Sequence, residues 1–263
     1  MDSESINRTS TLLASARKNA SPVPEIPAAD APQSIEDGYA LQAALHENLK
    51  KPGNGYLGGW KIGATTASMQ AYLGVDGPAY GRIMDYNIHS SEIALSSTGF
   101  VNPGIECEIA VRIGDVSTTE VQSKDTVAEI IEAVLPAIEI VENRYGDFLT
   151  RTSPTLIADD FFHKACVLGN EVSDWQDIDL AAVLGTTSVD GVKMGTGVGA
   201  DVMGHPLEAV AWLSNTLSAH NVTLKEGQVI LTGSVAPVIW LESFPCSVEI
   251  ELDDLGTVIA TFT

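Results

Sequence analysis

The sequence contains little cysteine, few aromatic residues and few basic residues. Its 263 residues include three cysteines, Cys107, Cys166 and Cys246, which lie far apart and form no CxxC motif. This spacing favours small buried thiols in a reducing compartment over a disulfide framework or a thiolate metal site. Aromatic residues make up 6% of the chain and hydrophobic residues 44%, so the core must be built mainly from aliphatic side chains.

Long apolar runs are also missing. No stretch reaches the roughly 18 uncharged apolar residues of a membrane-spanning helix. Residues 1–22 lack a basic start followed by an apolar run, so we expect no secretory signal and a cytoplasmic protein. The chain has 14 Lys and Arg but 35 Asp and Glu, which gives a formal charge of −21. A surface with this charge repels nucleic acid and anionic membranes. An anionic substrate would then need a locally positive site, which a bound divalent cation and one lysine would supply.

The chain is long enough for one large domain, or for a core domain with a smaller N-terminal one. Helices are predicted for residues 1–18, for a segment that Ser34 caps, for 126–136 and for 205–221. Most other segments after residue 56 read as strands. Because helices do not alternate regularly with these strands, the pattern indicates an α+β fold rather than a doubly wound one.

The segment IECEIAVRIG carries two acidic side chains on one face of a predicted strand. Side chains alternate along a strand, so Glu106 and Glu108 point one way and their apolar neighbours the other. Two adjacent carboxylates repel each other unless a cation or a proton lies between them. The pattern therefore fits a metal site, and it also fits the solvent face of an edge strand.

A second predicted strand, AIEIVENR, which we expect Pro136 to open, places Glu139 inside an apolar run. Burial of an unpaired carboxylate is costly, so Glu139 needs a partner. Three carboxylates on two strands suit a cation that prefers oxygen ligands, such as Mg²⁺ or Mn²⁺. No HxxxH or HExxH motif accompanies them, which disfavours zinc.

Two further segments offer groups that could bind an anion. Lys61 lies in the glycine-flanked strand GGWKIG, either as a lysine that extends to solvent from a strand end or as one held near a substrate. The LTGS segment ends another apolar strand, and the Ser234 hydroxyl could bind a carboxylate. The five histidines suggest no catalytic triad, and His205 is better explained as a helix cap.

The sequence resembles a known enzyme family. It contains GWKIG, GVDGPAYGRIMD, GIECEIAVRIG, LPAIEIVENR, IAD, GHPLEAVAWLSNTL and VILTGS in this order, from Gly58 to Ser234. These motifs are similar to those of the 2-oxopent-4-enoate hydratase and 4-oxalocrotonate decarboxylase group of the fumarylacetoacetate hydrolase superfamily. The resemblance implies a mixed β-roll with a smaller N-terminal α/β region. We divide the chain into residues 1–62, helical and extended, and residues 63–263, a β-rich catalytic domain.

The resemblance also implies roles for individual residues. The family's metal ligands match Glu106, Glu108 and Glu139, with Mg²⁺ or Mn²⁺ as the cofactor. Lys61 matches the lysine of the GxKxG strand as a catalytic and substrate-binding residue. Asp76 matches the catalytic acid of the GVD motif, and Ser234 matches the substrate-binding serine of LTGS. Residues between Lys61 and Gly81 resemble the family's mobile cover, and we expect a homo-oligomer.

The chain departs from its relatives after IAD, where the usual Asn-Ala-Ser is replaced by Asp160, Phe161 and Phe162. We predict that Asp160 binds substrate and that the two rings point into the pocket and shorten it. The same residues could instead pack in the core or at a subunit interface.

The resemblance implies a metal-dependent lyase that hydrates a 2-hydroxy-2,4-dienoate (2-oxopent-4-enoate) to a 4-hydroxy-2-oxo acid in aromatic catabolism. A decarboxylase of a 2-oxo diacid such as 4-oxalocrotonate would use the same metal and an enolate intermediate, so it stays open. An acylpyruvate-type C–C hydrolase needs a His-Glu pair that activates water, and residues 64–80 contain no convincing pair. A non-catalytic binding protein with the same fold is a further alternative, against which the intact acidic residues and Lys61 argue.

Overall fold

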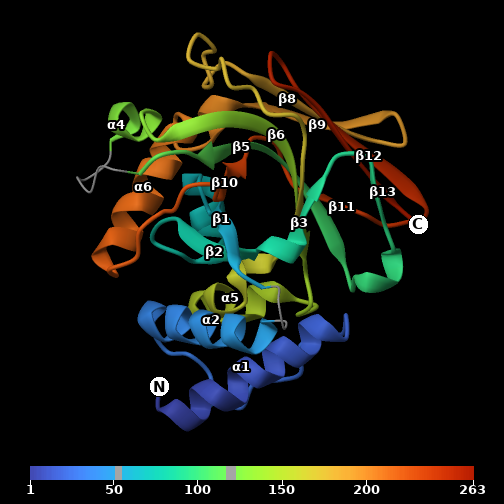
Figure 1. Ribbon diagram of the computed structural model, residues 1–263. Helices are drawn as coiled ribbons and strands as arrows, with labels where there is room; N and C mark the ends of the chain where they lie inside the picture. Colours follow the sequence, from blue (N-terminus) through green and yellow to red (C-terminus); the bar gives the residue numbers. More distant parts are fainter. Residues whose placement is uncertain (51–54, 117–122) are drawn as a thin grey trace.

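The computed structural model describes residues 1–50, 55–116 and 123–263. Two β-sheets form most of the molecule, and a layer of helices lies below the larger sheet in the view of Figure 1. The helices are α1 (Ser3–Lys18), α2 (Ile35–Leu49), α3 (Ala67–Leu73), α4 (Lys124–Ala128), α5 (Ser153–Ala158) and α6 (Pro206–Ala219). The α+β class expected from the sequence is confirmed.

The larger sheet has eight strands and is mixed, since β1 pairs with β10 in parallel and β5 pairs with both its neighbours antiparallel. In spatial order its strands are β2 (Ala79–Met84), β1 (Leu57–Gly63), β10 (Val229–Ser234), β5 (Pro103–Ile113), β6 (Ile131–Glu142), β7 (His163–Leu168) and β3 (Ile88–Ser90), with β11 (Ile239–Trp240) paired to β5. The sheet curves strongly in Figure 1, so β1, β5 and β10 surround a common interior.

The smaller sheet packs against the first. Its strands, in spatial order, are β4 (Ile93–Leu95), β13 (Gly256–Phe262), β12 (Cys246–Leu252), β8 (Leu184–Val189) and β9 (Val192–Val198). The main core lies between the two sheets and α6, and inward side chains of β5, β6, β12 and β13 belong to this one cluster. All three cysteines are free and buried, as predicted.

Helix ends follow the local signals in the sequence. Ser34 caps α2 by accepting a hydrogen bond from the Asp37 N–H at 3.2 Å. His205 caps α6 with its ring Nδ1, which accepts from the Leu207 N–H at 3.1 Å. Beyond α6, Asn221 has a φ of 58°, a conformation that stops a helix. These caps confirm the predicted helix starts at Ser34 and His205.

The helix predicted for residues 126–136 is wrong. Only Lys124–Ala128 is helical, and the chain enters β6 at Ile131. Both faces of β6 are buried, so its apolar residues are nearly continuous and their spacing does not distinguish a helix from a strand. Pro136 consequently lies inside the strand rather than at its start. The Pro136 carbonyl faces β7 and accepts from the Gly169 N–H, just beyond the last residue pair of β6 with β7. The backbone nitrogen of Pro136 faces the same way, so the hydrogen bonds between β6 and β5 do not depend on the N–H that proline lacks.

The N-terminal helices share a second core with the catalytic region. Leu13 of α1, Leu41 and Leu45 of α2, and Ile157 of α5 are buried together with the ring of Phe161. Residue 62, where we divide the chain, falls inside β1, which is hydrogen-bonded to strands on both sides. Among the described residues, no helix has the length and apolar character needed to cross a membrane.

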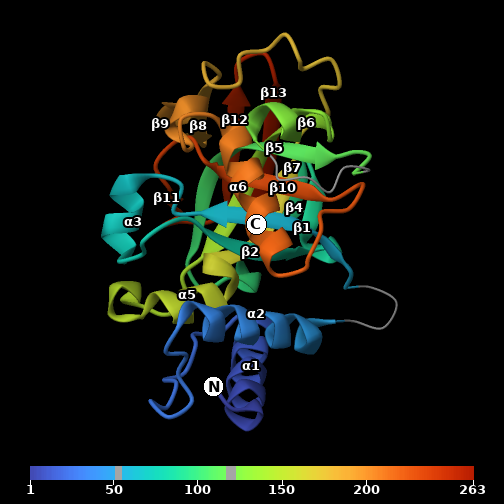
Figure 2. The same ribbon diagram turned by 90° about the vertical axis from the view of Figure 1, so that its left-hand side faces the viewer.

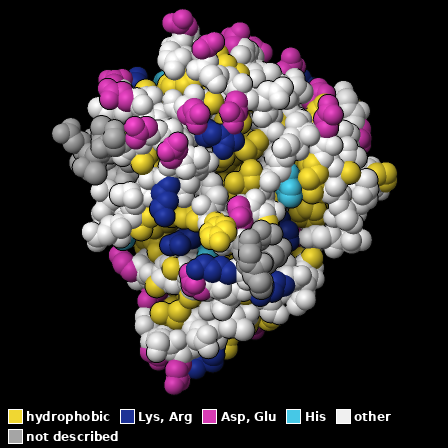
Figure 3. All heavy atoms as spheres, in the orientation of Figure 1, with side chains coloured by type: hydrophobic (Ala, Val, Ile, Leu, Met, Phe, Trp, Pro, Cys, Tyr) yellow, Lys and Arg dark blue, Asp and Glu magenta, His cyan; other side chains and the backbone are white. Residues whose placement is uncertain are grey.

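Charged side chains are unevenly spread over the surface. On the face in Figure 3, acidic side chains are most frequent in the upper half, whereas several basic side chains gather around the middle. The exterior is therefore strongly acidic overall, with a formal charge of −21. An anionic ligand would need a site with its own positive groups.

Candidate active site

Two neighbouring strands of the larger sheet bring three glutamates together. The antiparallel register of β5 and β6 places Glu106 directly opposite Glu139. Glu108 lies on the same face of β5, two residues along. One carboxylate oxygen of each residue lies within 4.8 Å of those of the other two. The three residues predicted to face a common cavity therefore form one cluster, here named the Glu cluster (Glu106, Glu108 and Glu139).

The electrostatics of the Glu cluster fit a bound cation. Burial, and then the charge of Glu139, raises the pKa of the Glu106 carboxyl to about 7. Burial and the two neighbouring carboxylates raise the pKa of Glu108 well above its ordinary value. Oε1 of Glu108 and Oε2 of Glu139 are buried without a hydrogen-bond partner. A divalent cation with oxygen ligands would satisfy these atoms and offset the repulsion, so the residues fit the metal that the sequence predicts.

Lys61 lies beside the Glu cluster. Its side chain is 2% exposed, and its ammonium lies 3.3 Å from Oε1 of Glu139 and donates to the Phe161 carbonyl at 3.1 Å. Burial alone would lower the pKa of Lys61, but the neighbouring glutamates outweigh burial and raise it. Lys61 is therefore a buried cation at the site, and the alternative of a lysine extending to solvent is excluded.

His163 is a neighbour of the cluster that the sequence did not reveal. Its Nδ1 lies 2.8 Å from Oε1 of Glu139, and the side chain is fully buried. Burial is the largest cause that lowers the pKa of His163. Although burial raises the pKa of Glu139, Lys61 and His163 outweigh it and lower that pKa. One signal in the sequence could have indicated His163: it is a polar residue at the first position of the apolar strand HKACVL.

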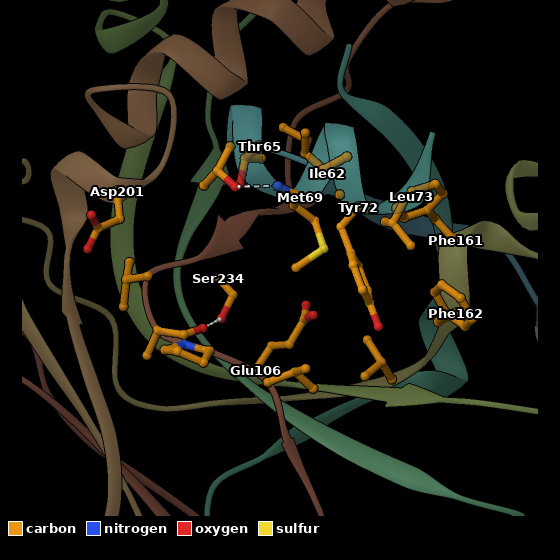
Figure 4. Close-up of a pocket in the computed structure, with 18 of the residues that line it drawn as sticks. Ile62, Thr65, Met69, Tyr72, Leu73, Glu106, Phe161, Phe162, Asp201 and Ser234 are labelled. Carbon is orange, nitrogen blue, oxygen red and sulfur yellow. Dashed lines mark hydrogen bonds between the residues drawn. The ribbon is translucent and has the colours of Figure 1, made fainter. Parts of the chain in front are cut away.

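A cavity of about 490 Å³ opens next to the Glu cluster. Figure 4 shows the Glu106 carboxylate pointing into it, with Ser234 on one side and Thr65, Met69 and Tyr72 above. The last two belong to α3, which stands at the left edge of the molecule in Figure 2. The segment that we predict to be a cover thus lies over the cavity.

The other predicted substrate-binding residues take different places. Ser234 lines the cavity, and its hydroxyl donates to the Ala236 carbonyl at 2.6 Å. Asp160 is buried away from the cavity, where its carboxylate meets Arg17 at 2.9 Å and His46 at 2.7 Å. The structure therefore does not bring the Asp160 carboxylate to the cavity, because Arg17 and His46 pair it inside the protein, and its role in binding substrate stays a prediction.

Two acidic residues outside the Glu cluster, Asp76 and Asp201, differ in position. Asp76 is exposed in the loop after α3 and does not line the cavity. Asp201, which no sequence motif indicated, does line it and accepts from the Val198 N–H at 2.8 Å. The structure therefore does not bring Asp76 to the Glu cluster, and its catalytic role stays a prediction.

Phe161 and Phe162, the two rings at which this chain differs from its relatives, both line the cavity, as predicted. Phe161 is also 3% exposed and belongs to the core shared with the N-terminal helices. The rings continue in edge-to-face contacts: Phe161 to Phe162 at 6.0 Å, Phe162 to Phe148 at 5.3 Å, and Phe148 to Tyr72 at 6.2 Å between centroids. We call these four residues the aromatic wall. It connects the cover to the loop that contacts Lys61.

The fold and this site are those of a known family. Residues 85–263 match the model for the fumarylacetoacetate (FAA) hydrolase C-terminal domain, and the chain belongs to this family. The chain is 35% identical to the 2-hydroxyhexa-2,4-dienoate hydratase of Comamonas testosteroni, over 78% of each chain. It is 33% identical to the 2-keto-4-pentenoate hydratase of Burkholderia vietnamiensis, over 86% of this chain and 85% of the relative. The resemblance inferred from the sequence motifs is confirmed.

Solved structures show the same fold. The 4-oxalocrotonate decarboxylase from Pseudomonas putida G7, complexed with magnesium and adipate, matches with a TM-score of 0.92 and 24% identity, over 100% of this chain and 99% of that one. The fumarylpyruvate hydrolase from Pseudomonas aeruginosa, in complex with Mn²⁺ and pyruvate, matches with a TM-score of 0.60 and 16% identity, over 78% and 88%. The FAA-hydrolase-like fold predicted from the resemblance is confirmed.

Proposed function

We propose that this protein is a divalent-metal-dependent hydratase that adds water to a 2-hydroxy-2,4-dienoate and forms a 4-hydroxy-2-oxo acid. The observation that carries the proposal is the convergence of the Glu cluster and the buried Lys61 at one end of an otherwise largely apolar cavity. The names of the similar hydratases support the reaction class.

The Glu cluster would hold the metal, with one carboxylate from each of its three residues. A divalent ion in this place supplies Lewis-acid chemistry and a template for the carboxylate and 2-oxygen of a 2-oxo acid. Oxygen-only ligands favour Mg²⁺ or Mn²⁺ over zinc, which prefers nitrogen and sulfur. His163 supports Glu139 through Nδ1, so its role is to orient that ligand.

Lys61 would bind the substrate carboxylate or transfer the proton that converts the dienol into the enone. In the metal-free protein the neighbouring glutamates raise the pKa of Lys61, which favours the charged ammonium, a group that has a proton to give. The Phe161 carbonyl fixes the direction of the Nζ atom. Water addition needs a further acid or base, for which Asp76 and Asp201 are the two candidates.

The charges that line the cavity favour a monocarboxylate. Among the described residues that line it, Lys61 is the one basic side chain. The Phe161 ring of the aromatic wall lies 5.6 Å from the Lys61 Nζ, and Asp201 lies across the cavity from Phe161 in Figure 4. A second carboxylate would meet rings or a like charge there and would lose its hydration without a partner. This arrangement supports a dienoate with an apolar tail over the alternative of a decarboxylase of a 2-oxo diacid such as 4-oxalocrotonate.

The C–C hydrolase alternative has less support. It needs a base that activates water near the cover, and α3 contains neither His nor Glu. We further propose that the protein acts in the cytoplasm on a small anionic 2-oxo acid, and that it assembles as a homo-oligomer.

The proposal is tested by spectroscopy. Purified protein with Mg²⁺ or Mn²⁺ should remove the absorbance of 2-hydroxypenta-2,4-dienoate, and exhaustive chelation should stop the reaction until metal is returned. Release of CO₂ from 4-oxalocrotonate is measured in parallel. Faster CO₂ release than dienoate loss would reverse the preference, and full activity after chelation would remove the metal from the reaction.

A further inference from the structure

The N-terminal helix α1 contributes a buried cation next to the active site. The Arg17 side chain is 7% exposed, and the first residue that it binds, Asp159, lies 142 positions further along the sequence. Its Nε donates to the Asp159 carboxylate at 2.6 Å, and one terminal nitrogen donates to the Asp159 carbonyl at 2.7 Å. The other terminal nitrogen lies 2.9 Å from the Asp160 carboxylate. One guanidinium thus holds both aspartate carboxylates and the Asp159 carbonyl.

The segment that Arg17 holds has an unfavourable backbone conformation. Asp160, Phe161 and Phe162 have φ values of 54°, 52° and 72°, and none of them is glycine. Left-handed residues of this kind cost free energy and persist only where surrounding contacts fix them. His46 of α2 and the Arg82 N–H bind the same Asp160 carboxylate, at 2.7 Å and 2.9 Å. The strained turn is therefore held mainly through Asp160.

The opposite side of the turn is part of the cavity. The Phe161 carbonyl accepts from Lys61, and both rings line the cavity. Two glycines allow this close approach. A Cβ on Gly81 would stand 2.6 Å from the Asp160 carbonyl oxygen, and one on Gly63 would stand 2.5 Å from the Phe161 ring. The position of the turn consequently determines both the direction of the ammonium and the place of the rings.

Resting on the proposed function, we propose that Arg17 and Asp160 are positioning residues of the active site. They act through the strained turn, which orients Lys61 and sets the inner end of the aromatic wall. Helix α1 then contributes to the geometry of the active site through Arg17. Asp160 acts on the substrate indirectly, without touching it.

The test compares three variants with the wild-type protein: Arg17→Lys, Arg17→Gln and Asp160→Asn. Displacement of the turn should lower kcat/KM by about 10- to 100-fold, since small misplacements remote from the chemistry have effects of this size. The variants should keep the wild-type affinity for Mn²⁺, measured by calorimetry, because the Glu cluster is untouched. Arg17→Lys should recover part of the loss, since lysine keeps the charge but not the fork of donors.

A matched control is Arg8→Gln. Arg8 lies on the same helix and also binds an aspartate, Asp30, at 2.6 Å, but this pair is on the surface. The control should keep wild-type turnover. The preference for longer over shorter dienoates gives a readout that loss of stability alone does not move. It should change in Arg17→Gln and Asp160→Asn and stay constant in Arg8→Gln.

A folded Asp160→Asn protein with wild-type kcat/KM and unchanged chain-length preference would overturn the inference, even if Arg17→Gln does not fold. Failure of the proposed function is measured separately, as the absence of dienoate turnover by the wild-type protein. If wild type does not turn over dienoates, pyruvate affinity of the Mn²⁺-loaded proteins replaces turnover. Weaker pyruvate binding in Asp160→Asn than in Arg8→Gln then supports the inference, and equal binding overturns it.

Discussion

Glu106 of β5 and Glu139 of β6 stand directly opposite each other on adjacent antiparallel strands. Like charges in this position destabilise a sheet. The protein nevertheless places Glu108 and Lys61 beside them and leaves two carboxylate oxygens unpaired. A pair of strands that carries this electrostatic cost serves a ligand rather than the fold, and the first prediction follows from it.

Glu106→Gln should weaken Mn²⁺ binding by at least about 10-fold, since perturbing even the outer partners of a ligand costs 10- to 100-fold. The metal-free variant should melt at the same temperature as wild type or above it, because one of the repelling carboxylates is gone. Calorimetry and thermal melting measure both effects. Glu249→Gln, an exposed change on β12, is the control. Unchanged Mn²⁺ affinity in Glu106→Gln would contradict the assigned ligand set.

Lys61→Ala should lower kcat/KM for the dienoate by about 10- to 100-fold, the value of a lost charged hydrogen bond. If Lys61 acts only through its charge, Lys61→Arg should lose less. If both variants lose turnover alike, proton transfer is the better account, because arginine does not release its proton. Lys193→Ala on the exposed strand β9 controls for loss of a positive charge. Near-normal kinetics of Lys61→Ala would remove this residue from the site.

The two rings after Asp160 should respond differently to truncation. Phe161 is buried in the core as well as in the cavity wall, so Phe161→Ala should lower the free energy of unfolding by about 3–5 kcal/mol. Phe162 is only half-buried, so Phe162→Ser should cost less stability and mainly lengthen the pocket. In Phe162→Ser, the ratio of kcat/KM for a longer dienoate to kcat/KM for a shorter one should rise about 10-fold, the effect of one or two methylene contacts. Melting temperature together with turnover of two chain lengths separates the effects, and an unchanged preference in Phe162→Ser would refute the pocket role.

Asp76→Asn and Asp201→Asn test which carboxylate serves as the acid or base. General acid–base catalysis contributes about 100- to 10,000-fold, so the responsible residue should lose kcat on this scale. The described geometry favours Asp201, which lines the cavity, whereas Asp76 requires the cover to move. Stopped-flow rates of dienoate consumption at saturating Mn²⁺ measure the difference. Small losses in both variants would leave the proton transfer to Lys61 or water.

Stability should fall in acid as the buried network at Asp159 is protonated. Burial alone would raise the pKa of Asp159, but Arg144 and Arg17 outweigh it and lower the pKa below the ordinary 3.8. A carboxyl with a depressed folded-state pKa contributes stability that is present above the unfolded value and is lost as pH falls through the folded one. Urea unfolding from about pH 5 to about pH 2 should therefore show a decline that is shallower in Asp159→Asn. Equal slopes would show that other groups control acid unfolding.

Local sequence was sufficient for several features of this site. Strand alternation placed Glu106 and Glu108 on one face, and the isolation of Glu139 in an apolar run required a partner for it. The caps Ser34 and His205 were also readable, because each signal lies within a few residues of the helix it starts.

Prediction from local sequence failed where a strand is buried on both faces, because its side chains then lack the alternation of apolar and polar residues. Residues 126–136 carry apolar side chains at spacings that fit a helix, and the sheet made most of them a strand. The partners of Asp160 were equally hidden, since Arg17 and His46 come from the N-terminal helices and no short-range pattern connects them. Asp160 was therefore assigned to the substrate although it belongs to the interior.

The sequence by itself determined which residues are able to bind a cation or an anion, because the types and spacing of the glutamates and of Lys61 constrain what they can bind. The tertiary structure alone decided which of them meet. Sheet register set Glu106 against Glu139, and the long-range packing of α1 brought Arg17 to the turn that contacts Lys61. These contacts depend on hydrogen-bond pairing and burial between distant segments, whose free energies are not encoded in any local stretch of the chain.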